Sequence, residues 1–186
     1  MNDIKRMSVT EIVELSVLAV LSMVTKPYIR SAIALFMTGL AVPVGVFAGG
    51  LYMAWVVLAG GISQTRGTTA LFCTLQGLLA LLLGMSGGLG PFVLVSYILP
   101  GLALEVLYAL VPLQPRPAWL CTLAGGIANL TGSTLNSILM FQLKGKMLAI
   151  WGIPSALSGA VGGYLGYLVL RRLVSLALRH PAREQH

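Results

Sequence analysis

The sequence predicts an all-α integral membrane protein, a bundle of six transmembrane helices with both ends of the chain in the cytoplasm. Two observations predict this fold. Of the 186 residues, 57% are hydrophobic and 9% are charged, whereas soluble domains carry about 25% charged residues. Stretches without Asp, Glu, Lys or Arg run from Ser31 to Thr65 and from Gly67 to Leu104, and a spanning helix needs about 20 mostly apolar residues. So few charges cannot cover a water-facing surface, which excludes a soluble enzyme and a disordered chain.

The first apolar stretch predicts a helix over 8–26. Ser8 or Thr10 is a favourable N-cap, and Glu11 lies in the first turn. Pro27 is expected to end this helix, because the residue before a proline avoids helical geometry. The apolar run Ser31–Val42 that follows is too short to span a bilayer. We expect it to lie as an interfacial or re-entrant segment beside the outer mouth of the bundle, where it closes over a bound ligand.

The remaining helices are bounded by clear breaks. The segment SGGLGP at 86–91 separates two apolar runs, and the prolines within 112–117 form a stiff turn. Lys144 begins a loop that includes Trp151. These breaks predict helices over 43–63, 68–85, 91–111, 118–142 and 154–178. Residues 1–178 then form a single transmembrane domain, and 179–186 form a polar cytoplasmic tail.

Lysine and arginine residues favour cytoplasmic loops, and their distribution sets the orientation of a membrane protein. With the N-terminus inside, eight basic residues lie on the inner side: Lys5, Arg6, Arg66, Arg116, Arg171, Arg172, Arg179 and Arg183. Four lie on the outer side: Lys26, Arg30, Lys144 and Lys146. This bias places both ends of the chain in the cytoplasm and the protein in the cell membrane. Because the basic residues mark helix ends, the net charge of +7 does not indicate nucleic-acid binding.

The sequence carries no arrangement of residues that indicates catalysis. Both histidines, His180 and His186, lie in the tail, and the chain lacks metalloprotease, nucleophile-elbow and phosphate-loop motifs. Cys73 and Cys121 lie inside apolar runs and are expected to be packing residues. An intramembrane enzyme needs acids or bases near its reaction centre. We therefore expect neither an enzyme nor a metal or cofactor site.

Polar and aromatic side chains within the spans are the candidates for ligand binding. Helical spacing puts Asn129, Ser133 and Asn136 on one side of the helix 118–142. Residues at comparable depth on other helices are Tyr52, Gln76 and Tyr97. Amides that donate and accept hydrogen bonds, together with aromatic rings, suit a neutral polar ring. Hydrogen bonds between helices explain the same amides equally well.

Glu105 is the one acidic residue that lies well inside a predicted span. Ionisable groups at such depth are costly and usually face the interior of the bundle. Two roles remain open for it. Glu105 contacts a ligand, or it is a structural carboxylate bonded to Tyr108 or to hydroxyl groups of a neighbouring helix.

The whole chain resembles the substrate-binding S component of an energy-coupling factor (ECF) vitamin transporter. The resemblance covers about 8–178 and includes the long apolar connection 28–42 and the lack of an ATPase motif. The segments RGTTA at 66–70, LGMSGGLGP at 83–91 and GLALE at 101–105 are similar to the subgroup that imports hydroxymethylpyrimidine, a thiamine precursor. Related S components take up cobalamin-precursor bases.

The resemblance implies a division of labour. The S component binds a vitamin or vitamin precursor near the outer face, while a membrane T component and two cytoplasmic ATPases drive its release. Small residues on one side of the first helix, Ser16, Ala19 and Ser22, are then the expected contact with the T component. Alternative interpretations are a membrane assembly factor without a ligand and a small lipid-modifying enzyme. The missing acid and histidine sites count against the enzyme.

Overall fold

The computed structural model describes residues 7–36, 44–63, 65–86, 88–112 and 114–179. Within these ranges the chain forms six α-helices and a short 3-10 turn, and no β-strand. The helices are α1 (Val9–Phe36), α2 (Val44–Ile62), α3 (Thr68–Leu82), α4 (Val93–Leu110), α5 (Ala118–Phe141) and α6 (Lys146–Arg179). The turn η1 (Gly90–Phe92) leads into α4. The all-helical fold predicted from the sequence is confirmed.

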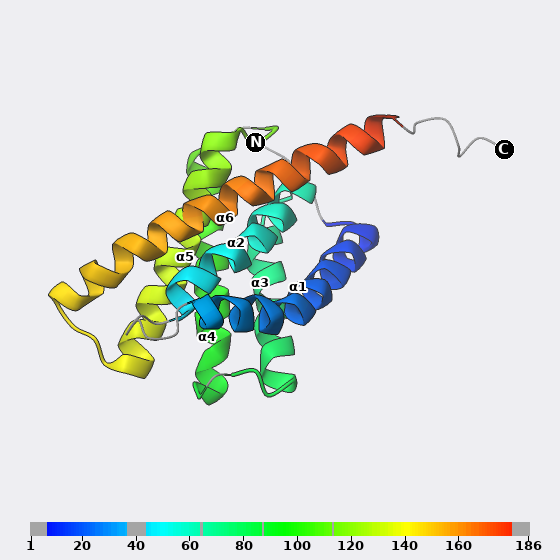
Figure 1. Cartoon of the computed structure of the whole chain (residues 1–186). Helices are drawn as coiled ribbons and strands as arrows, with labels where there is room; N and C mark the ends of the chain where they lie inside the picture. Colours follow the sequence, from blue (N-terminus) through cyan, green and yellow to red (C-terminus); the bar gives the residue numbers. More distant parts are fainter. Residues whose placement is uncertain (1–6, 37–43, 64, 87, 113, 180–186) are drawn as a thin grey trace.

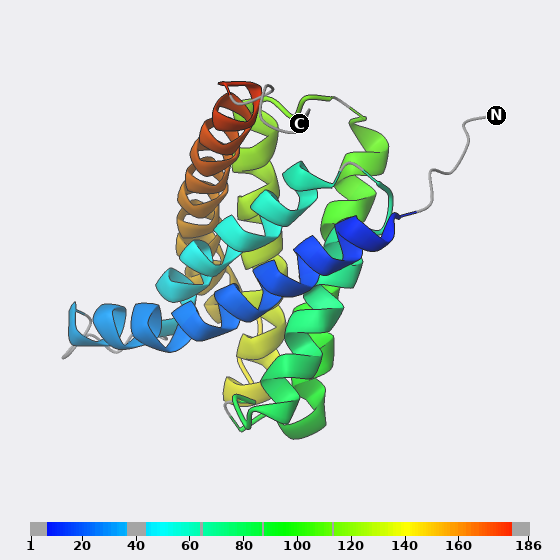
Figure 2. The same cartoon turned by 90° about the vertical axis from the view of Figure 1, so that its right-hand side faces the viewer.

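The helices form a bundle in which neighbours along the chain run in opposite directions (Figure 1 and Figure 2). α1 begins and α6 ends at the same end of the bundle, here termed the terminal end (Figure 2). α6 packs along α5 and α2, and α3 packs along α4. The last turns of α3 and α5 and the first turns of α4 and α6 therefore lie at the end opposite the terminal end, while the last turns of α1 extend sideways from the bundle (Figure 2).

Two predicted helix boundaries are wrong, because α1 and α6 each continue through a proline. α1 passes Pro27 and ends at Phe36, so part of the expected interfacial segment is helical, while 37–43 lie outside the described residues. α6 begins at Lys146 and passes Pro154. A proline removes one helical hydrogen bond and bends the helix, and α1 changes direction along its length (Figure 1). In a bilayer no water satisfies free backbone groups, so a bent helix is favoured over an unwound segment.

Glycines allow α6 to approach its neighbours closely. A Cβ atom at Gly162 would overlap the backbone carbonyl of Gly50 in α2, and one at Gly159 would overlap the carbonyl of Gly125 in α5. In lipid, van der Waals packing drives helix association, and small residues let two backbones meet. These contacts fix the position of α6 against α2 and α5.

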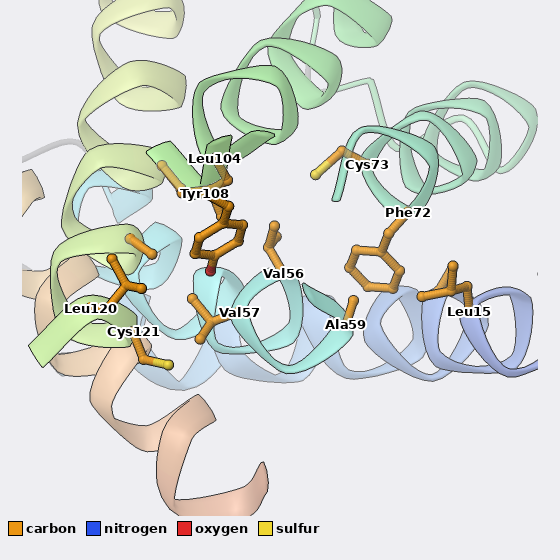
Figure 3. Close-up of a cluster of buried hydrophobic side chains, with 13 residues drawn as sticks. Leu15, Val56, Val57, Ala59, Phe72, Cys73, Leu104, Tyr108, Leu120 and Cys121 are labelled. Carbon is orange, nitrogen blue, oxygen red and sulfur yellow. The ribbon is translucent and has the colours of Figure 1, made fainter. Parts of the chain in front are cut away.

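A cluster of buried apolar side chains fills the half of the interior nearer the terminal end. Phe72 of α3 lies between Leu15 of α1 and Ala59 of α2, and Tyr108 of α4 points towards Val57 (Figure 3). All of these side chains are buried. The cluster joins α1 to α5, because Leu120 and Cys121 of α5 also belong to it, and it packs the interior of this half of the bundle.

The surface of the bundle is apolar, as a surrounding bilayer requires. Large apolar side chains are exposed on all six helices. Four segments of the described chain are long and apolar enough to cross a membrane: Val9–Phe36, Val44–Ile62, Gly90–Leu110 and Lys146–Leu176. α3 is a shorter apolar helix, and α5 carries a polar stripe formed by Asn129, Ser133 and Asn136. Polar side chains are directed inward instead, and they gather around a cavity.

Candidate ligand-binding site

A cavity of about 330 Å³ occupies the half of the bundle opposite the apolar cluster. Side chains of α1 to α5 line it, and Val56 and Cys73 belong both to its wall and to the cluster, which therefore forms its floor. Arg30, Gly45 and Met140 line the cavity and are exposed, so its mouth lies away from the terminal end. Small-molecule sites in proteins commonly measure about 300–1,000 Å³. The cavity is large enough for one small organic molecule.

Most of the predicted binding residues meet at this cavity. Its lining includes Tyr52, Gln76, Tyr97, Asn129, Ser133 and Asn136. They come from α2, α3, α4 and α5, and helical spacing alone could not show that these faces converge. Their contact with a ligand stays a prediction, but their convergence on one cavity is a feature of the structure.

The two amides of α5 have different surroundings. The Asn129 amide nitrogen donates to the backbone carbonyls of Val46 (3.1 Å) and Ser155 (2.8 Å) and to the Ser158 hydroxyl (3.0 Å). Asn129 thus ties α5 to α2 and α6. The Asn136 side-chain oxygen accepts a hydrogen bond from Ser96 of α4 (2.9 Å), and its amide nitrogen has no partner among the described residues. Asn136 therefore retains donors that a molecule in the cavity can use.

Lys26 is a cavity residue that the sequence analysis assigned to the outer surface. Its side chain is buried, and its amino group donates to the Gln76 side-chain oxygen at 3.0 Å. The same nitrogen lies 4.3 Å from the centre of the Tyr97 ring and 5.5 Å from that of the Tyr52 ring. Both distances fall within the range of cation–π attraction. The Tyr52 hydroxyl also donates to the Lys26 backbone carbonyl (3.1 Å), next to the bend at Pro27.

The charge of the cavity is positive. Among the described lining residues, Lys26 and Arg30 carry charge and neither Asp nor Glu is present. In the described part of the chain, no group of three or more His, Cys, Asp or Glu residues is placed to hold a metal ion. Amide, hydroxyl and aromatic groups make up the rest of the polar lining, so the cavity suits an organic molecule with hydrogen-bonding groups.

Glu105 lies outside the cavity lining and caps α3. Its carboxylate accepts hydrogen bonds from the backbone N–H groups of Gly67 (2.8 Å), Thr69 (2.7 Å) and Ala70 (3.4 Å), and from the Thr69 hydroxyl (2.5 Å). Gly67 stands at the N-cap of α3 with φ 86° and offers no side chain to cap the helix. A carboxylate from α4 therefore satisfies donors that every helix leaves free at its start. Of the two roles left open by the sequence, this geometry is that of the structural carboxylate.

The small residues expected to meet a T component lie mainly inside the chain itself. Ala19 and Ser22 are fully buried. The Ser22 hydroxyl donates to the Ala19 carbonyl (2.7 Å) and accepts a hydrogen bond from the Gln76 amide, so it faces α3. Ser16 is half-buried at the edge of this face. These residues pack α1 against its own bundle and leave little surface for another protein.

The sequence would have identified Lys26 as a cavity residue if the first helix had been predicted to continue through Pro27. If a helix continues through Pro27, Lys26 lies well within a span rather than at its outer end. Ionisable residues within spans usually face a cavity or the bundle interior. Ser96 and Ser137, which also line the cavity, offered no such signal because serine is common between packed membrane helices.

Comparison with known proteins agrees with this architecture. Residues 10–131 match the family described as the permease component of an ABC-type cobalt transport system. The chain belongs to this family. The permease fold is similar to a solved structure described as an S component of an ECF transporter, with a TM-score of 0.76 and 21% sequence identity over 93% of this chain and 88% of that chain. No curated protein matches the sequence.

These comparisons decide the class of the protein. The permease family consists of membrane transport components, so the chain is an integral membrane transport protein and not an enzyme. At 21% identity the solved S component shows the fold alone. The fold that the sequence resemblance implied, that of an ECF S component, is confirmed, while the subgroup and its substrate stay predictions.

Proposed function

We propose that this permease is the substrate-binding subunit of an ECF-type ABC importer, and that its cargo is a small vitamin or vitamin precursor. The observation that carries the proposal is the cavity of about 330 Å³ that α1, α2, α3, α4 and α5 enclose. Amides, hydroxyls and tyrosine rings line it. Such a lining fixes the orientation of a small heteroaromatic ring through a few polar contacts. Hydroxymethylpyrimidine and cobalamin-precursor bases are rings of this kind.

The family description names cobalt, and the chemistry of the cavity favours an organic cargo over the bare ion. Cobalt(II) is bound by imidazole, thiolate and carboxylate groups. Among the described lining residues, Cys73 is the one side chain of these types, and it is buried at the floor. Lys26 and Arg30 add positive charge, which repels a dication. A neutral ring needs no metal-ligating side chains and is not repelled by this positive charge.

The proposed partners are a membrane T component and two cytoplasmic ATPases, because the described chain resembles an S component and contains no ATPase motif of its own. Ala19 and Ser22 are buried within this chain, so we place the contact with the T component on another surface of α1. The exposed face of α1 carries a row of valines at helical spacing, Val13, Val17, Val20 and Val24. We assign the contact to this apolar row.

The proposal is tested by the molecule that the protein retains and by two asparagine variants. Mass spectrometry of protein purified in mild detergent should detect a bound heteroaromatic compound, and calorimetric titration with hydroxymethylpyrimidine should show saturable binding. Asn136→Ala is expected to weaken binding about 10-fold or more, equivalent to about 1.4 kcal/mol. Asn129→Ala should mainly lower the melting temperature, because it removes the amide that joins α5 to α2 and α6.

Two results would contradict the proposal. The first is a purified protein that carries no organic compound and binds none of the candidate rings. The second concerns the site: if Asn136→Ala binds as the parent does and only melts earlier, the stripe on α5 serves helix packing and the cavity assignment fails.

A further inference from the structure

The amino group of Lys26 is held in a fixed position at the cavity wall. The Ser22 hydroxyl donates its proton to the Ala19 carbonyl, so towards Gln76 it can only accept. The Gln76 amide nitrogen therefore faces Ser22, and its oxygen faces Lys26. This chain of hydrogen bonds makes Gln76 an acceptor dedicated to the Lys26 ammonium group.

Aromatic rings complete the surroundings of this group. The Lys26 nitrogen lies closest to the face of Tyr97, with Tyr52 on a second side. Two electron-rich rings and one amide oxygen stabilise the ammonium group in a buried position. An ammonium group has three N–H donors, and Gln76 supplies the one hydrogen-bond acceptor found for it among the described residues. The remaining donors are available to a molecule in the cavity that Lys26 lines.

Among the residues that the structure describes, no acidic side chain lines the cavity to offset this charge. Glu105 is engaged at the start of α3, and Glu11 accepts hydrogen bonds from Ser63 and Thr65 near the terminal end. Arg30 at the mouth adds a second positive group. A ligand therefore meets a positive field along the α1 side of the cavity and gains most if it presents a hydrogen-bond acceptor there.

We propose that Lys26 determines the specificity of this site. Its ammonium group donates to an acceptor on the ligand, such as a ring nitrogen, a carbonyl or a carboxylate, while Tyr97 packs beside the ring. The site takes neutral or anionic rings that carry such an acceptor and rejects rings with a fixed positive charge. This inference rests on the proposed function and narrows its substrate class.

Matched pairs of probes test the inference. Hydroxymethylpyrimidine and thiamine share a pyrimidine, and thiamine adds a permanently charged thiazolium ring. Dimethylbenzimidazole and its N,N′-dimethylated benzimidazolium ion, which carries a permanent positive charge, form a second pair. The ratio of the two dissociation constants within a pair is measured by calorimetry, and it is unaffected by the fraction of protein that is correctly folded.

The parent protein should prefer the neutral member of at least one pair by about 10-fold or more, about 1.4 kcal/mol. Lys26→Met keeps the length of the side chain and removes its charge and donors, so it should shift that ratio towards the cation by about 10-fold or more. Lys146→Met is the matched control, because Lys146 is exposed at the start of α6 and does not line the cavity. It should leave the ratio at the parent value.

Three outcomes would overturn the inference. A parent protein that binds the charged member of both pairs as tightly as the neutral member lacks the proposed selectivity, although the proposed function survives. An unchanged ratio in Lys26→Met removes Lys26 from the determinants of specificity. Binding of no member of either pair overturns the inference together with the proposed function for these ring classes.

Discussion

Replacement of Glu105 by glutamine tests whether this carboxylate belongs to the fold or to the ligand site. In the structure it accepts hydrogen bonds from three backbone N–H groups and one hydroxyl at the start of α3. Glu105→Gln retains one acceptor oxygen and turns the other into an amide that faces the Gly67 N–H group. The variant thus loses the charge and at least one hydrogen bond.

The expected cost follows from these contacts. Hydrogen bonds to charged groups contribute about 1.5–3 kcal/mol, and a buried donor left without an acceptor costs about 1–3 kcal/mol. Because Glu105 is half-buried and water can reach part of the site, we expect the free energy of unfolding to fall by about 1.5–3 kcal/mol. The affinity for hydroxymethylpyrimidine should stay within about 2-fold of the parent, less than the tenfold that corresponds to 1.4 kcal/mol.

The assay is unfolding in mixed micelles, with a denaturing detergent titrated against a mild one and followed by circular dichroism, alongside calorimetric titration of the ligand. Glu14→Gln is the matched control, because Glu14 is exposed on α1 and the substitution is chemically the same. It should leave both measurements unchanged. The reasoning is refuted if Glu105→Gln unfolds like the parent and binds the ligand 10-fold more weakly, since that result would make Glu105 a ligand contact.

Two further predictions concern helix packing and orientation. Gly162→Ala should destabilise the bundle by about 1–3 kcal/mol, because overpacking against a backbone has this cost, whereas Gly45→Ala, whose Cβ meets nothing within 4 Å, should gain about 0.5–1 kcal/mol. Equal melting temperatures for the two variants would show that α2 and α6 do not cross at their glycines. For orientation, cysteines placed at Gly145 and Gln185 in an otherwise cysteine-free chain should be labelled by a membrane-impermeant reagent at Gly145 alone in intact cells. Labelling at Gln185 alone would invert the topology.

The sequence determined the class of the protein because the relevant physics is local. Long runs without charge favour lipid over water, and in lipid every backbone polar group must be paired within the protein, which a helix achieves within its own segment. The limits of α2 and α5 were predicted to within about two residues by the turns that flank them, the usual uncertainty of a helix boundary. Asn129, Ser133 and Asn136 could be assigned to one helical face by spacing, because their separation decides it.

Only the tertiary structure decided which polar residues share a cavity and which hold helices together. Asn129 and Asn136 are chemically identical, and their different surroundings come from α2, α4 and α6, which pack against them. Glu105 acts on donors nearly forty positions earlier in the chain, a distance that no local pattern reports. The sequence analysis placed Lys26 at the outer surface because it ended the first helix at Pro27. α1 instead continues through Pro27, and packing of the bundle then places Lys26 in the cavity wall, where it is one of two charged side chains of the described lining.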